Sequence, residues 1–404
     1  MRMKLNKSSQ LLLASAASLL AAGLLSACST LTTDFVYVTS AKASGTNNYG
    51  EINIYEINSD SGHMRQIPAS PMYSEGRNPV AEAVSPDYSS LFVVNQDDNT
   101  VVQFTVGTDG KLYPINTVNT PGIYPLGIAV GSSNAFVLDT YQPLVTCTSS
   151  SPCSGSIGVF ALSSNQMKTT TANGSKTYWP LCATGYTLSG STYSCKATES
   201  DVIVPTGIAL SKSGTVLYVS AYDSTKTAGY LFSYTVGTSG ALTPVSVTAV
   251  SNGGKLSSIA VDTTGTYVYA TDYTNAKVHA FTSNAGVLTA LGSYAAGNGA
   301  SSIALNPAYG YAYVANAVDS NVIVYTVSNG TLTPLSVGAY ASGLEPVAIG
   351  VDPSKNQFVF TANFLGSTVS GWKMNTSDGS LMVSQGSPFS SNTNPTAVAA
   401  VPHK

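Results

Sequence analysis

The sequence predicts an all-β fold, a seven-bladed β-propeller with four-stranded blades and a ring closed by the C-terminal strand. A segment of small residues recurs seven times, with successive spacings of 46, 80, 51, 44, 46 and 49 residues. A period of about 40 to 50 residues with several strands per unit is typical of propellers. The last such segment, 394–402, lies at the C-terminus, whereas the first unit lacks it and begins directly at Phe35. We therefore expect the last segment to complete the first blade and close the ring.

The first strand of each unit is expected to line a central channel. Seven strands converge there, so only small side chains fit. One register of this strand holds Ala83, Ala129, Ala209, Ala260, Ala304, Gly350 and Ala399. The second and third strands alternate aromatic and aliphatic residues, as in 92–95, 313–316 and 322–327, and the fourth follows a glycine turn, as at Gly240 and Gly330. Glycine supplies the positive φ that short hairpins need.

The third unit is longer than the others, because an insertion occupies about residues 142–200. It contains four cysteines, Cys147, Cys153, Cys182 and Cys195. An even number of cysteines in an exported chain indicates disulfides, and we expect the nearest-neighbour pairs Cys147–Cys153 and Cys182–Cys195. A metal site is the competing interpretation, but no histidine or CxxC motif accompanies them. The insertion is either a stapled loop or a binding surface for another protein.

The N-terminus predicts export. Arg2, Lys4 and Lys7 precede an apolar run from Leu11 to Leu25, as in a secretion signal. The run ends in Leu-Ser-Ala-Cys at 25–28, which resembles the lipobox of bacterial lipoproteins and implies that Cys28 is diacylated. Residues 1–27 are then the signal peptide, 28–33 a lipidated linker and 34–404 the propeller. Ser29 favours the outer membrane of a Gram-negative bacterium. An ordinary cleaved signal or a membrane anchor is the alternative.

Composition limits the partners of the mature chain. Only 9% of residues are charged, against roughly 25% in typical soluble domains. After Ala27 the chain has 14 basic and 20 acidic residues, a net charge near −6. Nucleic acid and anionic membrane surfaces are therefore excluded as partners, and membrane contact is expected only through the lipid anchor. A small-molecule ligand or an envelope protein remains as partner, and we expect a monomer.

The unit pattern resembles a known family. The segments 85–95 (SPDYSSLFVVN) and 306–316 (NPAYGYAYVAN), together with the Gly-x-Leu-Thr-Pro turns, are similar to those of the bacterial lactonase family of seven-bladed propellers, which includes 6-phosphogluconolactonase-like proteins. The resemblance implies a carboxylic ester hydrolase that opens a lactone at the channel mouth. A non-catalytic ligand- or protein-binding propeller is the alternative. It is favoured by the scarcity of arginine and histidine, because the mature chain has only Arg65, Arg77, His63, His279 and His403.

Glu82 is the candidate catalytic residue. Its register holds only aliphatic residues in the other six units, namely Ile128, Ile208, Ile259, Ile303, Ile349 and Val398. A carboxylate at an apolar position must be paired or protonated, so Glu82 is a candidate general acid or base. Arg77, five residues upstream, is its candidate partner or an anion clamp. A structural pair, or a water-bound acid that closes the channel, is the competing interpretation.

A second set of polar residues stands at the ends of the second strands. These positions hold Ser40, Asn95, Asp139, Ala221, Asp272, Asn316 and Asn363. The five residues Asn95, Asp139, Asp272, Asn316 and Asn363 are candidate ligand-binding residues, or else they cap turns locally. The nearby run Asp97-Asp98-Asn99 offers oxygen ligands for Ca²⁺, but its spacing matches no EF-hand, and we expect no required cofactor and no metal site. No Gly-x-Ser-x-Gly motif or phosphate-binding glycine loop occurs.

Overall fold

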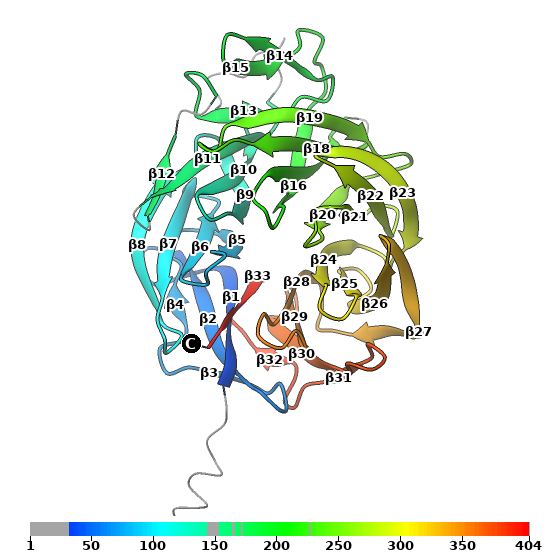
Figure 1. The fold of residues 1–404 in the computed structure, drawn as a ribbon. Helices are drawn as coiled ribbons and strands as arrows, with labels where there is room; N and C mark the ends of the chain where they lie inside the picture. Colours follow the sequence, from blue (N-terminus) through cyan, green and yellow to red (C-terminus); the bar gives the residue numbers. More distant parts are fainter. Residues whose placement is uncertain (1–31, 144–152, 164–165, 171–172, 226–227, 404) are drawn as a thin grey trace, which may run out of the picture.

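Seven antiparallel sheets surround a central axis in the computed structural model (Figure 1). The structure describes residues 32–403 except 144–152, 164–165, 171–172 and 226–227. The predicted all-β propeller is confirmed, and the described residues contain no helix. Accordingly, no helix in this part of the chain could cross a membrane. The signal peptide, the lipidation site Cys28 and Cys147 lie outside the described residues.

Each blade has its first strand at the channel and its last strand at the rim (Figure 1). Blade 1 is β33 (Pro395–Pro402), β1 (Thr32–Ser44), β2 (Tyr49–Asn58), β3 (Met64–Gln66) and β4 (Met72–Tyr73). Blade 2 is β5 (Pro79–Val84), β6 (Ser90–Asn95), β7 (Thr100–Val106) and β8 (Leu112–Asn119). Blade 3 is β9 (Ile123–Val130), β10 (Asn134–Tyr141), β11 (Ser156–Ser163), β12 (Gln166–Thr169) and β13 (Tyr178–Pro180).

The other four blades follow the same order. Blade 4 is β16 (Ile203–Leu210), β17 (Val216–Asp223), β18 (Gly229–Val236) and β19 (Leu242–Ala249). Blade 5 is β20 (Leu256–Val261), β21 (Tyr267–Asp272), β22 (Lys277–Asn284) and β23 (Val287–Ala295). Blade 6 is β24 (Ala300–Asn306), β25 (Tyr311–Asn316), β26 (Asn321–Ser328) and β27 (Thr331–Ala341). Blade 7 is β28 (Pro346–Val351), β29 (Phe358–Asn363), β30 (Thr368–Met374), β31 (Leu381–Val383) and β32 (Phe389–Ser390).

The ring closes in blade 1, as the repeat pattern predicts. Strand β1 pairs antiparallel with β33 on its channel side, from Asp34 opposite Pro402 to Thr39 opposite Ala397, and with β2 on its other side. The C-terminal strand therefore supplies the inner strand that the first unit lacks. Because β33 also contacts the inner strands β28 and β5 of the neighbouring blades, no gap remains in the wall of the channel.

A small residue on the inner strand faces an aromatic ring on the second strand in every blade. The pairs are Ala83–Phe92, Ala129–Phe136, Ala209–Tyr218, Ala260–Tyr269, Ala304–Tyr313, Gly350–Phe360 and Ala399–Tyr37. All seven rings are buried. A ring needs the space that the small partner leaves free. The small inner register therefore reflects two constraints, crowding at the channel and the size of the aromatic neighbour.

Hydroxyl groups on the inner strands join neighbouring blades. Each inner strand has a register shift near its start, where the ladder to the second strand skips a position. At three of these bulges a hydroxyl donates to a backbone carbonyl at the start of the next inner strand. These bonds are Ser257 Oγ to Ala300 O at 2.6 Å, Ser301 Oγ to Pro346 O at 2.6 Å and Thr396 Oγ1 to Pro79 O at 2.9 Å. The bulges thus place polar groups where blades meet at the channel.

The glycine turns also pack against the preceding blade. Gly330, between β26 and β27, has φ +79°, and a Cβ added there would lie 2.3 Å from the ring of Tyr267 in blade 5. Gly379 repeats this arrangement against Tyr311 of blade 6. The turn glycines are therefore required both by their positive φ and by the ring that lies against them.

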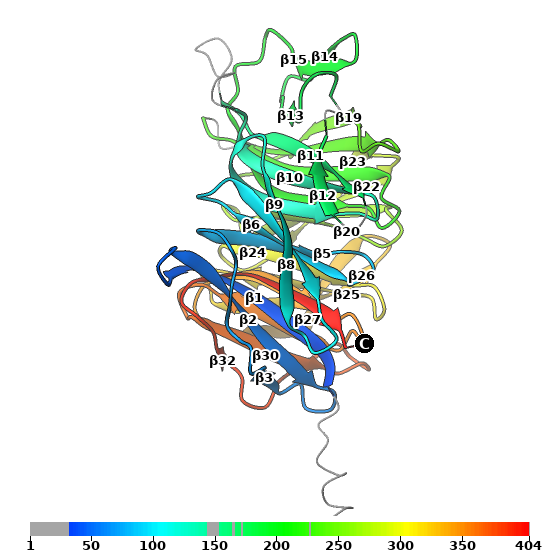
Figure 2. The same cartoon turned by 90° about the vertical axis from the view of Figure 1, so that its left-hand side faces the viewer.

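The blade-three insertion is anchored on blade 4. It contains the hairpin β14 (Tyr186–Ser189) and β15 (Thr192–Cys195), which projects from the rim of the ring (Figures 1 and 2). Trp179 Nε1 donates to Leu242 O at 3.0 Å, and the hydroxyls of Tyr186 and Tyr234 are 2.6 Å apart. Trp179 and Leu181 belong to the core shared by blades 3 and 4. Part of the insertion is therefore core, because it fills space beside β18 and β19.

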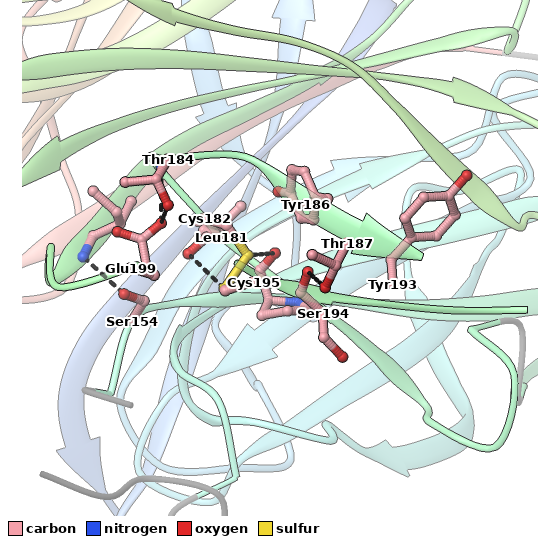
Figure 3. Close-up of a disulfide and its surroundings, with 12 residues drawn as sticks. Ser154, Leu181, Cys182, Thr184, Tyr186, Thr187, Tyr193, Ser194, Cys195 and Glu199 are labelled. Carbon is pink, nitrogen blue, oxygen red and sulfur yellow. Dashed lines mark hydrogen bonds between the residues drawn. A yellow bond between two sulfur atoms is a disulfide. The ribbon is translucent and has the colours of Figure 1, made fainter. Parts of the chain in front are cut away.

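The predicted disulfide Cys182–Cys195 is present, with an S–S distance of 2.06 Å (Figure 3). It joins Cys182, which precedes β14, to Cys195, the last residue of β15. Glu199 accepts hydrogen bonds from the backbone and hydroxyl of Thr184 beside it. Cys153 is also disulfide-bonded, but the predicted pairing with Cys147 involves a residue outside the described part of the chain.

Replacing Gly330 with alanine tests the dual role of the turn glycines. Gly214, with φ +73° and no neighbouring atom within 4 Å of an added Cβ, is the matched control. G214A is expected to cost about 1–2 kcal/mol, the penalty of a left-handed alanine. G330A adds overpacking against Tyr267 and is expected to cost a further ~1–3 kcal/mol. Urea unfolding of both variants measures the difference, and equal losses would show that the contact with Tyr267 is unimportant.

Candidate functional site at the channel mouth

Seven residues at the entrance to the inner strands surround one mouth of the channel. Each stands one position before the repeated small-residue segment, and they are Asn78, Tyr124, Val204, Lys255, Gly299, Glu345 and Asn394. Five of them have positive φ, between 52° and 69°: Asn78, Tyr124, Gly299, Glu345 and Asn394. This conformation is uncommon for residues such as tyrosine and glutamate, and strained residues concentrate at functional sites. We define these seven positions as the channel mouth.

The backbone carbonyls of the mouth residues have a repeated structural partner, the backbone that follows the second strand of the same blade. Asn78 O accepts from Gln96 N at 2.9 Å, Gly299 O from Ala317 N at 2.8 Å, and Glu345 O from Phe364 N at 2.8 Å. Lys255, whose φ is not positive, makes the same bond, because its O accepts from Tyr273 N at 3.0 Å. The backbone of the mouth is therefore fixed by the blades through bonds that do not involve its side chains.

The predicted ring of polar residues at the second-strand ends lies beneath the mouth loops. Asn95, Asp139, Asp272, Asn316 and Asn363 are fully buried. Three of them accept from glycine amides in the loops above: Asp139 from Gly122 at 3.0 Å, Asp272 from Gly254 at 2.8 Å and Asn316 from Gly297 at 3.0 Å. These contacts favour local capping of the loops. A direct role in ligand binding remains a prediction, and it would require the loops to move.

Arg77 does not pair with Glu82. Its guanidinium Nε lies 2.6 Å and Nη2 lies 2.5 Å from Asp98 Oδ1, and its backbone N donates to Asp98 Oδ2 at 2.7 Å. Blade 6 repeats this arrangement, because Asn298 donates to Asp319 through its backbone N at 2.7 Å and its side chain at 3.0 Å. The partner predicted for Arg77 is thus corrected. Asp98 lies in the loop that faces Arg77 and binds its guanidinium, whereas the carboxylate of Glu82 lies between blades 1 and 2.

The oxygen atoms of Asp97-Asp98-Asn99 are engaged in the same loops. Asp97 Oδ1 accepts from Asn78 Nδ2 at 3.0 Å, and Asn99 Oδ1 accepts from Tyr124 N at 2.7 Å. With Asp98 bound to Arg77, all three side chains have protein partners. No group of three or more His, Cys, Asp or Glu residues with metal-binding geometry occurs among the residues that the structure covers.

Glu82 lies at the boundary between blade 2 and the closing blade. Its Oε2 accepts from the hydroxyl of Thr39 on β1, and its carboxyl accepts from the backbone of Ala399 on β33. Its Oε1 is buried and has no hydrogen-bond partner in the described structure. Burial raises the pKa of Glu82 to about 8, which favours the protonated carboxyl. Glu82 therefore connects blade 2 to both strands of the closure.

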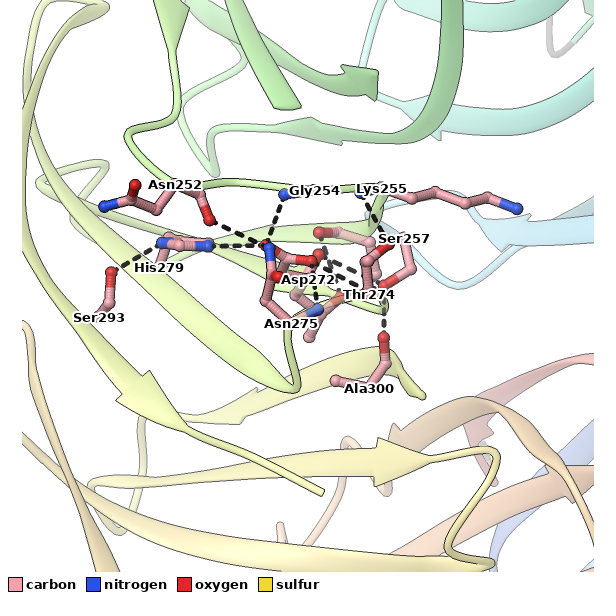
Figure 4. A network of polar contacts seen from close by, with 12 residues as sticks. Asn252, Gly254, Lys255, Ser257, Asp272, Thr274, Asn275, His279, Ser293 and Ala300 are labelled. Carbon is pink, nitrogen blue, oxygen red and sulfur yellow. Dashed lines mark hydrogen bonds and ion pairs between the residues drawn. The ribbon is translucent and has the colours of Figure 1, made fainter. Parts of the chain in front are cut away.

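Lys255 is a mouth residue that was not predicted from the sequence. Its Nζ lies 5.5 Å from the ring centroid of Tyr222 and 6.0 Å from that of Tyr273. Figure 4 shows its side chain extending away from the buried network around Asp272. It is exposed and forms no ion pair with the residues that the structure describes. The sequence feature that could have identified Lys255 is its position directly before the repeated small-residue segment, which it shares with Asn78 and Glu345.

Comparison with protein families matches the chain to the family described as Lactonase, 7-bladed beta-propeller. The matches cover residues 184–286 and 277–397, which together exceed half of the 404-residue chain. The chain therefore belongs to this family, and the predicted resemblance is confirmed. No curated protein matches the sequence.

Solved structures of similar proteins agree in fold. A putative 6-phosphogluconolactonase from Bacteroides fragilis is 18% identical, with a TM-score of 0.69 over 92% of this chain and 99% of that chain. One from Bacteroides uniformis is also 18% identical, with a TM-score of 0.70 over 92% and 100%. The periplasmic gluconolactonase PpgL of Pseudomonas aeruginosa is 17% identical, with a TM-score of 0.66 over 91% and 99%. These identities support the shared fold alone.

The buried acids predict that stability decreases as the pH rises. Burial raises the pKa of Glu82 and of Asp139 to about 8 and that of Asp34 to about 7, whereas unfolded carboxyls titrate near 4. Between these limits the folded state binds more protons, so the free energy of unfolding falls from about pH 4.5 to about pH 8. E82Q removes the contribution of Glu82. Its free energy of unfolding should therefore fall less than that of the parent, with a difference of a few kcal/mol at most. Urea unfolding near pH 5 and pH 8.5 measures it.

If E82Q and the parent lose equal stability over this range, Glu82 does not have a raised pKa. The isosteric amide can still accept from Thr39 and Ala399, so the comparison changes the titrating group and little else.

Proposed function

We propose that this protein is a cell-envelope lipoprotein that binds an acidic lactone at the channel mouth and hydrolyses it. The observation that carries this proposal is Lys255, an exposed cation held beside Tyr222 and Tyr273 in a propeller of the lactonase family. A lactone that bears a carboxylate or phosphate would gain a charge-assisted hydrogen bond from the ammonium group. The tyrosine rings would offer apolar surface for the sugar ring.

The hydrolysis would need a proton for the departing ring oxygen. Water would attack the carbonyl carbon, the ring C–O bond would break, and the ring oxygen would take up a proton to give a hydroxy acid. Glu82, protonated at neutral pH because burial raises its pKa to about 8, is the candidate donor. It lies on β5, four residues beyond the mouth residue Asn78 and roughly 13 Å along the strand from it, so substrate would have to enter the channel.

A non-catalytic binding propeller is the second candidate, and two observations favour it. Arg77 is neutralised by Asp98, which limits its use as an anion clamp. Glu82 is already hydrogen-bonded across the blade boundary to Thr39. In this alternative Lys255 and its tyrosines bind an anionic ligand, and Glu82 serves the ring alone.

The envelope location is supported by the lipobox-like segment at 25–28 and by two disulfide-bonded segments, at Cys153 and at Cys182–Cys195, because disulfides persist outside the reducing cytoplasm. The similar gluconolactonase PpgL of Pseudomonas aeruginosa is a periplasmic protein. An exported enzyme would not meet a phosphorylated lactone made in the cytoplasm, so a lactone with a free carboxylate suits this location better.

Replacing Lys255 tests the binding role. Against glucarolactone, which carries a carboxylate, K255A is expected to raise KM, or Kd in the absence of turnover, by about tenfold, the loss of one charged hydrogen bond. Neutral gluconolactone should bind equally to both proteins. K212A removes an exposed lysine on the loop between β16 and β17, away from the mouth, and is the matched control. Equal loss for both lactones, or an effect of K212A, would contradict the proposal.

E82Q separates the enzyme from the binding propeller. If Glu82 donates the proton, kcat should fall by about 10²–10⁴ while Kd for glucarolactone is unchanged, measured by pH-stat titration and calorimetry. Turnover that is the same in E82Q and the parent would exclude Glu82 as the donor, and absence of turnover with retained binding would favour the alternative.

The lipid anchor is tested at Cys28. C28S is expected to abolish incorporation of radiolabelled palmitate and to move the protein from the membrane pellet to the soluble fraction, because acyl chains provide the membrane affinity. C153S, a cysteine within the propeller, is the control and should keep the label. A labelled C28S protein would refute the lipobox assignment.

A further inference from the structure

A serine, a histidine and an aspartate form a continuous chain of contacts in blade 5, which runs from Asp272 beneath the mouth loops to Ser293 on the outer strand. His279 Nε2 lies 3.1 Å from Asp272 Oδ2, and His279 Nδ1 lies 2.7 Å from Ser293 Oγ (Figure 4). The three residues come from the consecutive strands β21, β22 and β23. Each of the three side chains therefore comes from a strand of the sheet.

The hydrogen-bonding groups around Asp272 determine the charge of its carboxyl and the direction of the hydrogen bonds among Asp272, His279 and Ser293. Asp272 also accepts from Gly254 N at 2.8 Å, Asn275 N at 3.0 Å and Asn275 Nδ2 at 2.9 Å. Burial alone would raise the pKa of Asp272, but the bonds from His279, Gly254 and Asn275 lower it to about 2. An ionised carboxylate can only accept, so the hydrogen between it and His279 resides on Nε2. In the neutral imidazole, Nδ1 is then the acceptor for the hydroxyl of Ser293.

The exposure of the side chain increases from Asp272 through His279 to Ser293. The side chain of Asp272 is 0% exposed and that of His279 is 3% exposed, whereas Ser293 is exposed. An imidazole that is shielded from water and oriented by a buried carboxylate, next to a hydroxyl that solvent reaches, is the arrangement that activates a serine nucleophile.

A bulge in the outer hairpin creates this alignment. The hairpin pairs Asn284 with Val287 and Phe281 with Ala290, and an unbroken ladder would place His279 opposite Gly292. The register shift at Leu291 instead places His279 opposite Ser293. Bulges commonly redirect a side chain at a functional site. Here the extra residue exchanges a glycine for the hydroxyl that contacts the imidazole.

The same register directs the backbone N–H of Ser293 away from the ladder. Ala296 N donates to Ala276 O at 2.8 Å, so these two residues form a hydrogen-bonded pair. Hydrogen-bonded and non-hydrogen-bonded pairs alternate in antiparallel sheets, and three positions further on His279 and Ser293 form a non-hydrogen-bonded pair. The N–H of Ser293 therefore points to the outer edge of blade 5, where β23 is the last strand. There it can donate to an oxyanion that develops at Ser293.

We propose that Ser293 is a nucleophile for acyl transfer, with His279 as its general base and Asp272 as the positioning residue, and that this site accepts exposed, uncharged esters at the rim of blade 5. Ser293 Oγ attacks the ester carbonyl carbon while its proton passes to His279 Nδ1. The C–O bond to the alcohol breaks, and the alcohol leaves with that proton. Water then hydrolyses the acyl-serine and regenerates the hydroxyl.

The site is distinct from the lactone site of the proposed function. Ser293 stands on the outermost strand of its blade, whereas Lys255 precedes the innermost strand. Ser293 is exposed on the last strand of its blade, so small acyl esters that need little enclosure are the expected substrates.

Labelling with a fluorophosphonate probe tests the nucleophile directly. Ser293 Oγ forms a bond to phosphorus, the P–F bond breaks, fluoride leaves, and His279 takes the serine proton. On the full-length protein, tandem mass spectrometry should locate the adduct on Ser293. Ser336, exposed on the outer strand β27 of blade 6, is the internal control, because the strands of that blade contain no histidine. Absence of an adduct, or equal labelling of Ser336 and Ser293, would overturn the proposal.

Three variants distinguish an activated serine from a reactive surface hydroxyl. S293A should abolish the adduct and the hydrolysis of 4-nitrophenyl acetate that depends on this site. H279Q, whose folding is checked by its thermal unfolding midpoint, should slow labelling at least about a hundredfold. D272N should shift the midpoint of the labelling rate against pH to lower pH, because the imidazolium loses its carboxylate. Unchanged labelling in H279Q, or an unchanged midpoint in D272N, would show that the contacts serve only the structure.

Urea-unfolded parent protein provides a final control. The geometry exists only in the folded sheet, so labelling of Ser293 should disappear on unfolding. Persistent labelling of the unfolded chain would mean that the serine reacts without the relay, which contradicts the proposal.

Discussion

The antiparallel pairing of β33 with β1 is the constraint on which the other features of the ring depend. It brings together residues more than 350 positions apart, such as Thr39 and Ala397, and fills the one position at the channel that the first unit lacks. Without β33 the inner strands β28 and β5 would face an opening, and β1 would expose an unpaired edge. The closing strand also carries Ala399, whose small side chain leaves space for the buried ring of Tyr37. Closure and packing of blade 1 are therefore one interaction.

The position of Glu82 follows from this closure. In the other six blades the register of Glu82 is aliphatic. Blade 2 alone follows a blade made from both chain ends, and Glu82 accepts there from Thr39 on β1 and Ala399 on β33. A protonated carboxyl that contacts both strands connects the two ends to the rest of the ring. This explains why an acid is tolerated at the boundary between the two blades.

The repeated frame separates the requirements of the fold from those of function. Small inner residues, buried aromatic rings and turn glycines recur in the blades because neighbouring strands leave each of them little space. The mouth residues share a backbone position but differ in chemistry, from Asn78 to Lys255 to Glu345. The backbone bonds that hold them do not involve their side chains, so this face can change its ligand without a change in the ring.

Much of this frame could be predicted from the sequence because its causes are local and repeated. The spacing of small strands identified seven blades, the matching terminal segment identified the closure, and the close pair of cysteines in the insertion identified Cys182–Cys195. The site was less predictable. Arg77 was expected beside Glu82 because the two are near in sequence, but Asp98, 21 residues away, is its partner. Lys255 was overlooked because a lysine before a strand is ordinary in sequence, and its two tyrosines belong to different blades.

The sequence by itself therefore determined the class of fold, the number of blades, the closure and the candidate carboxylate, since each follows from a periodic pattern that strands impose. Only the tertiary structure decided which polar groups meet. The contact between His279 and Ser293 depends on a single bulge at Leu291, and a register one residue different would place glycine there. Side chains in a sheet alternate between its faces with a period of two, so one inserted residue changes every partner beyond it. That change leaves no signature in composition or spacing.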